Sequence, residues 1–118
     1  MKQRFFRSDR VAKAWEIDLV LRDGKRLRSE AVTLNWRPRT GGCGGARFCV
    51  SVRKKAAASA PVRNRAKRLA REFFRQNKKD FRAGMDIVLQ VHKCDIQNYK
   101  ELEKQLAPIF RKTGLLDV

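Results

Sequence analysis

The stretch VRNRAKRLAREFFRQNKK, residues 62–79, decides the fold predicted for this chain. At about 100° per residue, its side chains separate into two faces of one amphipathic helix. The apolar face holds Val62, Ala66, Leu69, Ala70 and Phe73. The opposite face is basic and holds Arg63, Lys67, Arg68, Arg71, Arg75, Lys78 and Lys79. We therefore expect one side to pack on a core and the other to present positive charge.

Several residues of this stretch qualify the pattern. Pro61 suits the first turn of a helix, where its missing N–H has no partner to lose. Asn64 can either cap the helix or reach a phosphate or a base edge. Phe74 lies at the edge of the basic arc, and the pattern leaves open whether it packs inward. A solvated helix face usually mixes both signs of charge, so this nearly acid-free face indicates a polyanionic partner.

Composition supports the same interpretation. The chain has 118 residues, a formal net charge of +17 and 42% hydrophobic residues, which predicts a single globular domain over residues 1–118. Nucleic acid is a better candidate partner than a membrane, because no apolar run approaches the ~18–20 residues of a span. The N-terminal residues lack the apolar core of a signal peptide, so we expect a cytoplasmic protein.

Residues that could perform catalysis or bind a metal are sparse. Three cysteines without a Cys-x-x-Cys pair favour a reducing compartment over a disulfide framework. His92 and Cys94 could supply only half of a metal site. The single histidine has no acidic or cysteine partner at motif spacing, and the glycines of residues 41–45 do not form a phosphate-binding loop. The sequence thus predicts a binding protein without a protein-borne catalytic site.

The segments around the basic helix predict a small sheet. Residues 31–36 and 47–52 are expected to be strands, separated by a flexible glycine-rich loop over residues 37–46. The second strand is apolar at nearly every position, which predicts cover on both faces. A third strand is expected over residues 85–91. A helix over residues 98–112 follows, with Pro108 expected to kink or shorten it and Gly114 to end it.

The N-terminal segment permits two interpretations. Residues 1–7 are expected to form a flexible arm, and Ser8 could cap a helix that runs to about Arg22 and ends at a left-handed Gly24. Alternating apolar residues from Trp15 to Leu21 instead favour a hairpin that turns at Asp23 and Gly24. In either case the order of elements predicts an α+β sandwich with helices over a small sheet.

A motif then places the chain beside a known family. Arg47-x-x-Val-Ser-Val-x-Lys-Lys55, followed by Arg63-Asn-Arg-x-Lys-Arg-x-x-Arg71-x-x-Phe74, closely resembles the bacterial ribonuclease P protein subunit. The similarity extends from about Arg10 to Leu115. It implies a two-layer α/β sandwich of α-β-β-β-α-β-α order, as in some ribosomal proteins, with an unusual left-handed βαβ crossover. It also implies that the N-terminal segment is helical.

The resemblance also implies a function. The ribonuclease P ribonucleoprotein is an endoribonuclease that removes the 5′ leader of precursor tRNA. In the family, the RNA subunit holds Mg²⁺ and performs the cleavage. The protein, a monomer within the complex, binds that RNA and the single-stranded leader. By position, the residues expected to contact RNA are Arg63, Asn64, Arg65, Lys67, Arg68 and Arg71, with Lys54 and Lys55 beside the leader path.

The family's first helix commonly carries aromatic residues where this chain has Ile17 and Leu21. Together with Phe48, these two residues are the expected leader cleft, where apolar contact would replace part of the stacking energy. Trp15, Trp36 or Phe48 could compensate. The alternatives are a non-catalytic ribosomal-type RNA-binding protein and a sequence-tolerant DNA-binding protein. Neither alternative explains the Arg-Asn-Arg motif together with the upstream Val-Ser-x-Lys-Lys motif.

Overall fold

The fold was analysed in a computed structural model that describes residues 10–11, 13–39, 44–56, 59–93 and 99–116. Its elements in chain order are α1 (Ala14–Asp23), β1 (Lys25–Arg28), β2 (Val32–Pro38), β3 (Arg47–Val52), α2 (Ala60–Gln76), β4 (Met85–Val91) and α3 (Tyr99–Lys112). Short 3-10 turns occupy Lys54–Ala56 and Lys78–Asp80. The expected α-β-β-β-α-β-α order and the α+β class are confirmed.

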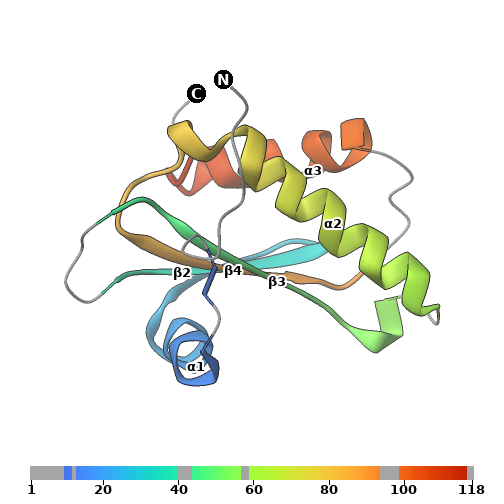
Figure 1. Ribbon diagram of the computed structural model, residues 1–118, viewed down its shortest axis with the longest axis horizontal. Coiled ribbons are helices and arrows are strands. Elements are labelled where there is room, and N and C mark those ends of the chain that lie inside the picture. The colour runs from blue at the N-terminus through green and yellow to red at the C-terminus, as the bar shows by residue number, and fades with distance from the viewer. Residues whose placement is uncertain (1–9, 12, 40–43, 57–58, 94–98, 117–118) are drawn as a thin grey trace.

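The four strands form one mixed sheet in the order β1-β2-β4-β3. β2 is antiparallel to both β1 and β4, whereas β3 runs parallel to β4. Helix α2 connects these two parallel strands, as the resemblance implies. Figure 1 shows α2 and α3 above the sheet and α1 beneath it, close to one end of the strands. The sheet therefore has one face covered by α2 and α3 and one face that α1 covers in part.

The core lies between the sheet and the pair α2 and α3. Alternate residues of the strands point into it, with Leu34, Val50 and Leu89 in register across the sheet. Five phenylalanine rings join the strands to the two helices: Phe48, Phe73, Phe74, Phe81 and Phe110. This aromatic cluster fixes the position of α2 on the sheet.

Helix α2 follows the predicted faces closely. Ala66, Ala70 and Phe73 are buried, and Leu69 packs against the core. Val62 is an exception, because 41% of its surface is exposed at the start of the helix. The residue that precedes the helix is Ser59, so Asn64 is not the cap. Phe74 also packs inward, with none of its surface exposed, which settles the position that the pattern left open.

The N-terminal segment is helical, so the hairpin favoured by local alternation is wrong. The helix begins at Ala14 rather than near Ser8, which lies outside the described residues. The left-handed stop at Gly24 is also wrong, because this glycine has an extended φ of −80°. Its role is close approach: a Cβ there would come within 2.6 Å of the Trp36 carbonyl oxygen and still nearer to that of Val20. Glycine thus lets α1 turn directly into β1.

Other expectations need smaller corrections. β3 is an edge strand with Ser51 exposed, so it is not covered on both faces. The loop begins two residues later than expected, because β2 extends to Pro38. Its tip, residues 40–43, and the N-terminal arm lie outside the described residues.

Pro108 does not shorten α3, which continues to Lys112. Gly114 does end the helix, with a left-handed φ of +78°.

Candidate nucleic-acid interface

The basic face of α2 lies on the outer side of the helix, away from the aromatic cluster. Asn64, Arg65 and Arg68 are exposed, whereas Arg63, Lys67 and Arg71 are half-buried along the flanks. The helix contains one acidic residue, Glu72. A row of cations on a rigid helix can contact several phosphates of a folded RNA without reorganising. The structure thus keeps all six predicted residues of this motif on one element.

Glu72 neutralises one end of this face. Its carboxylate accepts hydrogen bonds from the guanidinium of Arg75, including one of 2.8 Å from Nε, and one of 2.9 Å from Gln76. These bonds lower the pKa of Glu72 from 4.5 to about 2. Arg75 is consequently engaged in an ion pair within the helix.

A hollow joins α2 to the edge of the sheet. It is lined by Arg10, Val11, Ile17, Phe48, Cys49, Val50 and Arg71. The structure therefore brings together the predicted leader residue Ile17 and the predicted RNA-contacting residue Arg71, which are far apart in sequence. Burial raises the pKa of the Cys49 thiol, against the opposing charges of Arg71, Lys67 and Arg10. Three cations thus act on the floor of this hollow.

The ring of Phe48 is not the exposed apolar contact that the sequence predicted. Only 1% of its surface is exposed, and its ring stacks on Phe74 in the core on the opposite side of the sheet from α1. Strand alternation explains the difference, because Phe48 and Cys49 point to opposite faces. The residue is part of the core, and Cys49 provides the surface at this point of β3.

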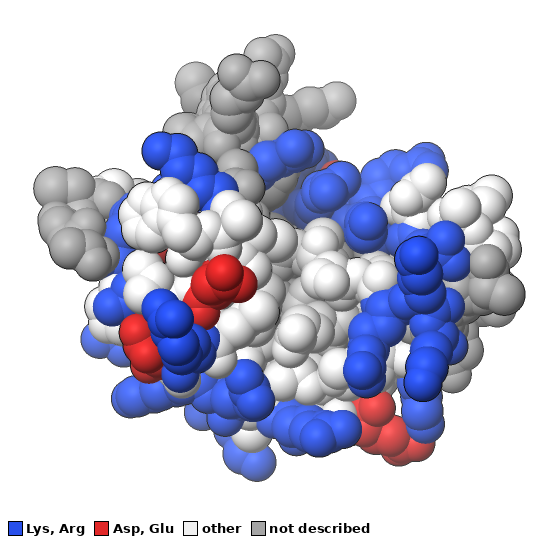
Figure 2. Space-filling view, turned by 90° about the horizontal axis from the view of Figure 1, so that it is seen from below, with Lys and Arg blue, Asp and Glu red and all other residues white. Residues whose placement is uncertain are grey.

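The partly covered face of the sheet lies next to this hollow, beside α1. Ile17 and Leu21 form the adjacent flank of α1, and the sheet contributes Cys49, Ser51 and Gln90; we call these five residues the cleft surface. Figure 2 views the molecule from this side, with α1 on the left. It shows uncharged surface beside α1, and Lys and Arg side chains around that uncharged surface. Neutral surface bordered by cations suits a single strand of nucleic acid, with its bases on the neutral surface and its phosphates beside the cations.

Basic residues surround the cleft surface at the ends of the strands. Lys54 and Lys55, which are expected beside the leader path, are exposed directly after β3. Arg28 and Arg53 approach the half-buried His92, whose Nε2 lies 2.5 Å from the Thr33 hydroxyl. Burial and these two arginines lower the pKa of His92. Sequence reasoning missed Arg28 and His92; period-two alternation in residues 25–28 was the signal that could have placed Arg28 on this face.

A buried ion cluster holds α1 against the sheet. The Arg47 guanidinium donates two hydrogen bonds of 2.8 Å to Asp86 and one of 2.5 Å to Glu16 of α1. These carboxylates raise the pKa of Arg47. Arg39 adds a longer contact of 3.8 Å to Asp86. This cluster joins α1 to β3 and β4 beside the cleft surface.

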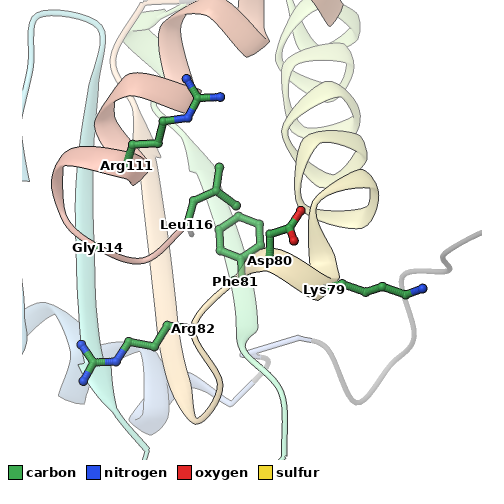
Figure 3. A pocket seen from close by; sticks show the side chains of 7 residues that line it. All are labelled: Lys79, Asp80, Phe81, Arg82, Arg111, Gly114 and Leu116. Carbon is green, nitrogen blue, oxygen red and sulfur yellow. The ribbon is translucent and has the colours of Figure 1, made fainter. Parts of the chain in front are cut away.

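Another hollow lies at the far ends of α2 and α3. Figure 3 shows its lining residues, with Phe81 and Leu116 between the chain segments and with Lys79, Arg82 and Arg111 apart from one another, none of them pointing toward another. Cations that lie apart cannot bind one anion together, so this surface adds positive charge without forming an anion-binding site. Among the described residues, no cluster of three His, Cys, Asp or Glu side chains could hold a metal ion. No helix in the described part of the chain is long and apolar enough to cross a membrane.

Relatives and solved structures agree with this arrangement. The chain is 48% identical over 67 residues to the ribonuclease P protein component of Pseudoalteromonas translucida, a match that covers 56% of this chain and 47% of that protein. It is 37% identical over 70 residues to the same component of Bacillus cereus, covering 58% and 60%. The matches thus span about half to three fifths of these relatives. The RNase P protein of Thermotoga maritima superposes with a TM-score of 0.76 at 26% identity, covering 87% of this chain and 96% of that one.

The RNase P protein of Staphylococcus aureus shares the fold, with a TM-score of 0.82 at 18% identity over 92% of this chain and 98% of that one. The family model described as Ribonuclease P matches residues 5–114, which is nearly the whole chain. The motif residues of α2, β3 and the segment after β3 all lie within that match. The chain belongs to the ribonuclease P protein family.

Proposed function

We propose that this protein is the accessory subunit of a ribonuclease P ribonucleoprotein, which removes the 5′ leader of precursor tRNA. In this assignment the catalytic RNA holds the Mg²⁺ ions and cleaves the phosphodiester bond. The protein binds that RNA and the leader, and so raises the affinity for the substrate. Family membership supports the complex, and the absence of a metal-binding cluster among the described residues is compatible with chemistry performed by the RNA.

The observation that carries the proposal is the position of two surfaces on one rigid body. The basic face of α2 and the cleft surface beside α1 meet at the hollow that Ile17 and Arg71 line together. A protein bound to the catalytic RNA through α2 would therefore hold the cleft surface next to that RNA. A single strand emerging from the active centre could enter the cleft surface without crossing open solvent.

We assign the two surfaces to different RNAs. Arg63, Asn64, Arg65, Lys67, Arg68 and Arg71 contact the catalytic RNA, and Ile17 and Leu21 contact bases of the leader. Lys54 and Lys55 neutralise leader phosphates at the end of β3. Aliphatic side chains offer apolar contact to any base, so the cleft surface should bind leaders with little sequence preference.

Reconstitution with a bacterial ribonuclease P RNA at low magnesium tests the proposal. Added protein should promote precursor cleavage there, and the complex should bind precursor more tightly than mature tRNA. Replacing both Lys54 and Lys55 by alanine should reduce this preference without releasing the catalytic RNA. Unchanged cleavage on adding protein would favour a non-catalytic RNA-binding role. Equal affinity for precursor and mature tRNA would remove the leader from the assignment.

A further inference from the structure

Trp15 lies outside the surfaces described above. It stands in the first turn of α1 with 60% of its surface exposed. A tryptophan usually buries most of its large apolar area, so an indole exposed to this extent is available for contact with another molecule. On the helix, Trp15 is about 160° from Ile17, at about 100° per residue. It therefore lies on the flank of α1 that faces away from the cleft surface.

A hollow on that flank places Trp15 beside positive charge. It is lined by Trp15, Glu16, Leu19, Arg37, Arg39, Arg47 and Asp86. Its two carboxylates are already engaged by Arg47, through contacts of 2.5 Å to Glu16 and 2.8 Å to Asp86. Three arginines against two carboxylates leave an excess of one positive charge. The hollow thus combines an exposed aromatic ring with a net positive wall.

Arg37 is the cation available to a ligand. Arg47 is committed to its ion pairs, and Arg39 donates a 2.8 Å hydrogen bond to the Gly45 carbonyl oxygen and lies 3.8 Å from Asp86. Within the described ranges, the guanidinium of Arg37 has no hydrogen bond or ion pair, and the residue is half-buried on β2. A guanidinium held in this way can grip a phosphate with paired hydrogen bonds.

We propose that Trp15 and Arg37 form a nucleotide-binding site, which receives an unpaired nucleotide of the leader after the strand has crossed α1 from the cleft surface. The indole stacks on the base and Arg37 binds its phosphate. This inference rests on the proposed function. A duplex stem offers no free base face, so the ligand is single-stranded. Among single strands the leader is favoured, because a helix only about 10 Å across separates this site from the cleft surface.

Tryptophan fluorescence in the reconstituted holoenzyme tests the proposal. The chain has two tryptophans, so Trp36→Phe leaves Trp15 as the only reporter. Two precursors are compared, one with a leader that ends within the cleft surface and one whose leader is several nucleotides longer. The longer leader should quench Trp15 and bind about 5- to 150-fold more tightly, the range expected for stacking of one base.

Variants then show which residues cause the higher affinity for the longer leader. In the protein with both tryptophans, Trp15→Ala and Arg37→Ala should lose the length-dependent gain while keeping the affinity for the short leader. Trp15→Phe should keep most of the gain. Arg111→Ala removes the same charge as Arg37→Ala from exposed surface of α3 and should change nothing.

Three outcomes would overturn the inference. A length-dependent gain that survives in Trp15→Ala shows that the extra nucleotides bind elsewhere. Quenching of Trp15 on adding the catalytic RNA alone assigns the site to that RNA instead of the leader. If neither precursor binds better than mature tRNA, the leader-binding function itself fails and the inference fails with it. The comparison of the short leader with mature tRNA distinguishes this last case from the first two.

Discussion

Phe48 of β3 stacks on Phe74 of α2, with ring centroids 5.0 Å apart and planes 14° from parallel. At most 1% of either side chain is exposed. The pair joins the edge strand to the helix that carries the basic face. Phe74 borders that face in the helical projection, yet its ring belongs to the core. The orientation of the Arg-Asn-Arg motif toward RNA therefore depends on a contact on the other side of the helix.

Phe74→Ala should reduce the free energy of unfolding by about 3–5 kcal/mol, because it removes a fully buried aromatic ring and leaves a cavity. Urea denaturation measures the change. Val62→Ala is the control from the same helix: its side chain is 41% exposed, so the loss should be within about 0.5 kcal/mol. A similar loss in both variants would show that Phe74 is not part of the core.

Arg65→Ala and Arg68→Ala should weaken binding to the catalytic RNA and flatten its salt dependence. Each lost phosphate contact lowers the slope of log K against log salt by about 0.7–0.9. Filter binding over a salt series measures this slope, and Arg111→Ala serves as a charge-matched control on α3. If the slopes of all three variants equal that of the parent protein, the face of α2 is solvated and makes no phosphate contact.

Much of the fold could be predicted because local and tertiary preferences agree. The strands Arg47–Val52 and Met85–Val91 were predicted to the residue, and the two faces of α2 were predicted except at Val62. The N-terminal segment failed where these preferences conflict. Alternation from Trp15 to Leu21 favours a strand, but α1 lies across the sheet and needs only Val20 fully buried. A helix that covers only part of one face of the sheet buries few side chains. Its sequence can therefore fold as a helix without a clear apolar repeat of 3.6 residues.

The site was predictable where a motif lies on one element and less so where several elements meet. Of the basic face predicted for α2, Arg68 is exposed on the outer side, whereas Arg63, Lys67 and Arg71 are half-buried along its flanks. Phe48 was misplaced because an apolar edge strand does not show which alternate residues face the core. The position of His92 beside Arg28 and Arg53 depends on strand register, which the sequence does not specify. Arg37 and Trp15 are likewise brought together only by the packing of α1 on the sheet.

Arg47→Met should destabilise the fold by about 3–5 kcal/mol, because it leaves the buried carboxylate of Asp86 without its bidentate partner. The side chain of Asp86 is 7% exposed, and that of Glu16 is 15% exposed. Chemical denaturation of the single variant and of Arg47→Met with Asp86→Leu tests this cause. The double variant should recover most of the loss. Failure to recover would indicate that packing of the arginine, rather than the unpaired charge, sets the cost.

Glu72 should make the free energy of unfolding depend on pH between about 4.5 and about 2. Its pKa in the folded protein is about 2, below the ordinary value of 4.5, so the folded state holds the carboxylate more firmly charged. This contribution is complete above about pH 4.5 and is lost as the pH falls through about 2. Glu72→Gln should be slightly less stable than the parent at neutral pH, and the difference should shrink through this window. A difference that stays constant with pH would exclude the ion pair with Arg75 as its cause.

His92 should report RNA binding at the cleft surface. In the free protein its pKa is lowered by burial and by Arg53 and Arg28, so the imidazole is neutral at pH 7. Phosphates that bind these arginines would reduce their repulsion and raise the pKa. The bound state then takes up a proton, so leader affinity should increase as the pH falls between the two pKa values.

The chain has one histidine, so a single NMR titration of its ring resonance measures both states. Arg53→Gln should raise the pKa of His92 in the free protein, because it removes one of the two opposing charges. His92→Gln should make leader affinity independent of pH over the same range while leaving the affinity for mature tRNA unchanged. An identical pKa of His92 with and without the leader would place the leader phosphates away from Arg28 and Arg53. The leader would then pass beside Lys54 and Lys55 instead.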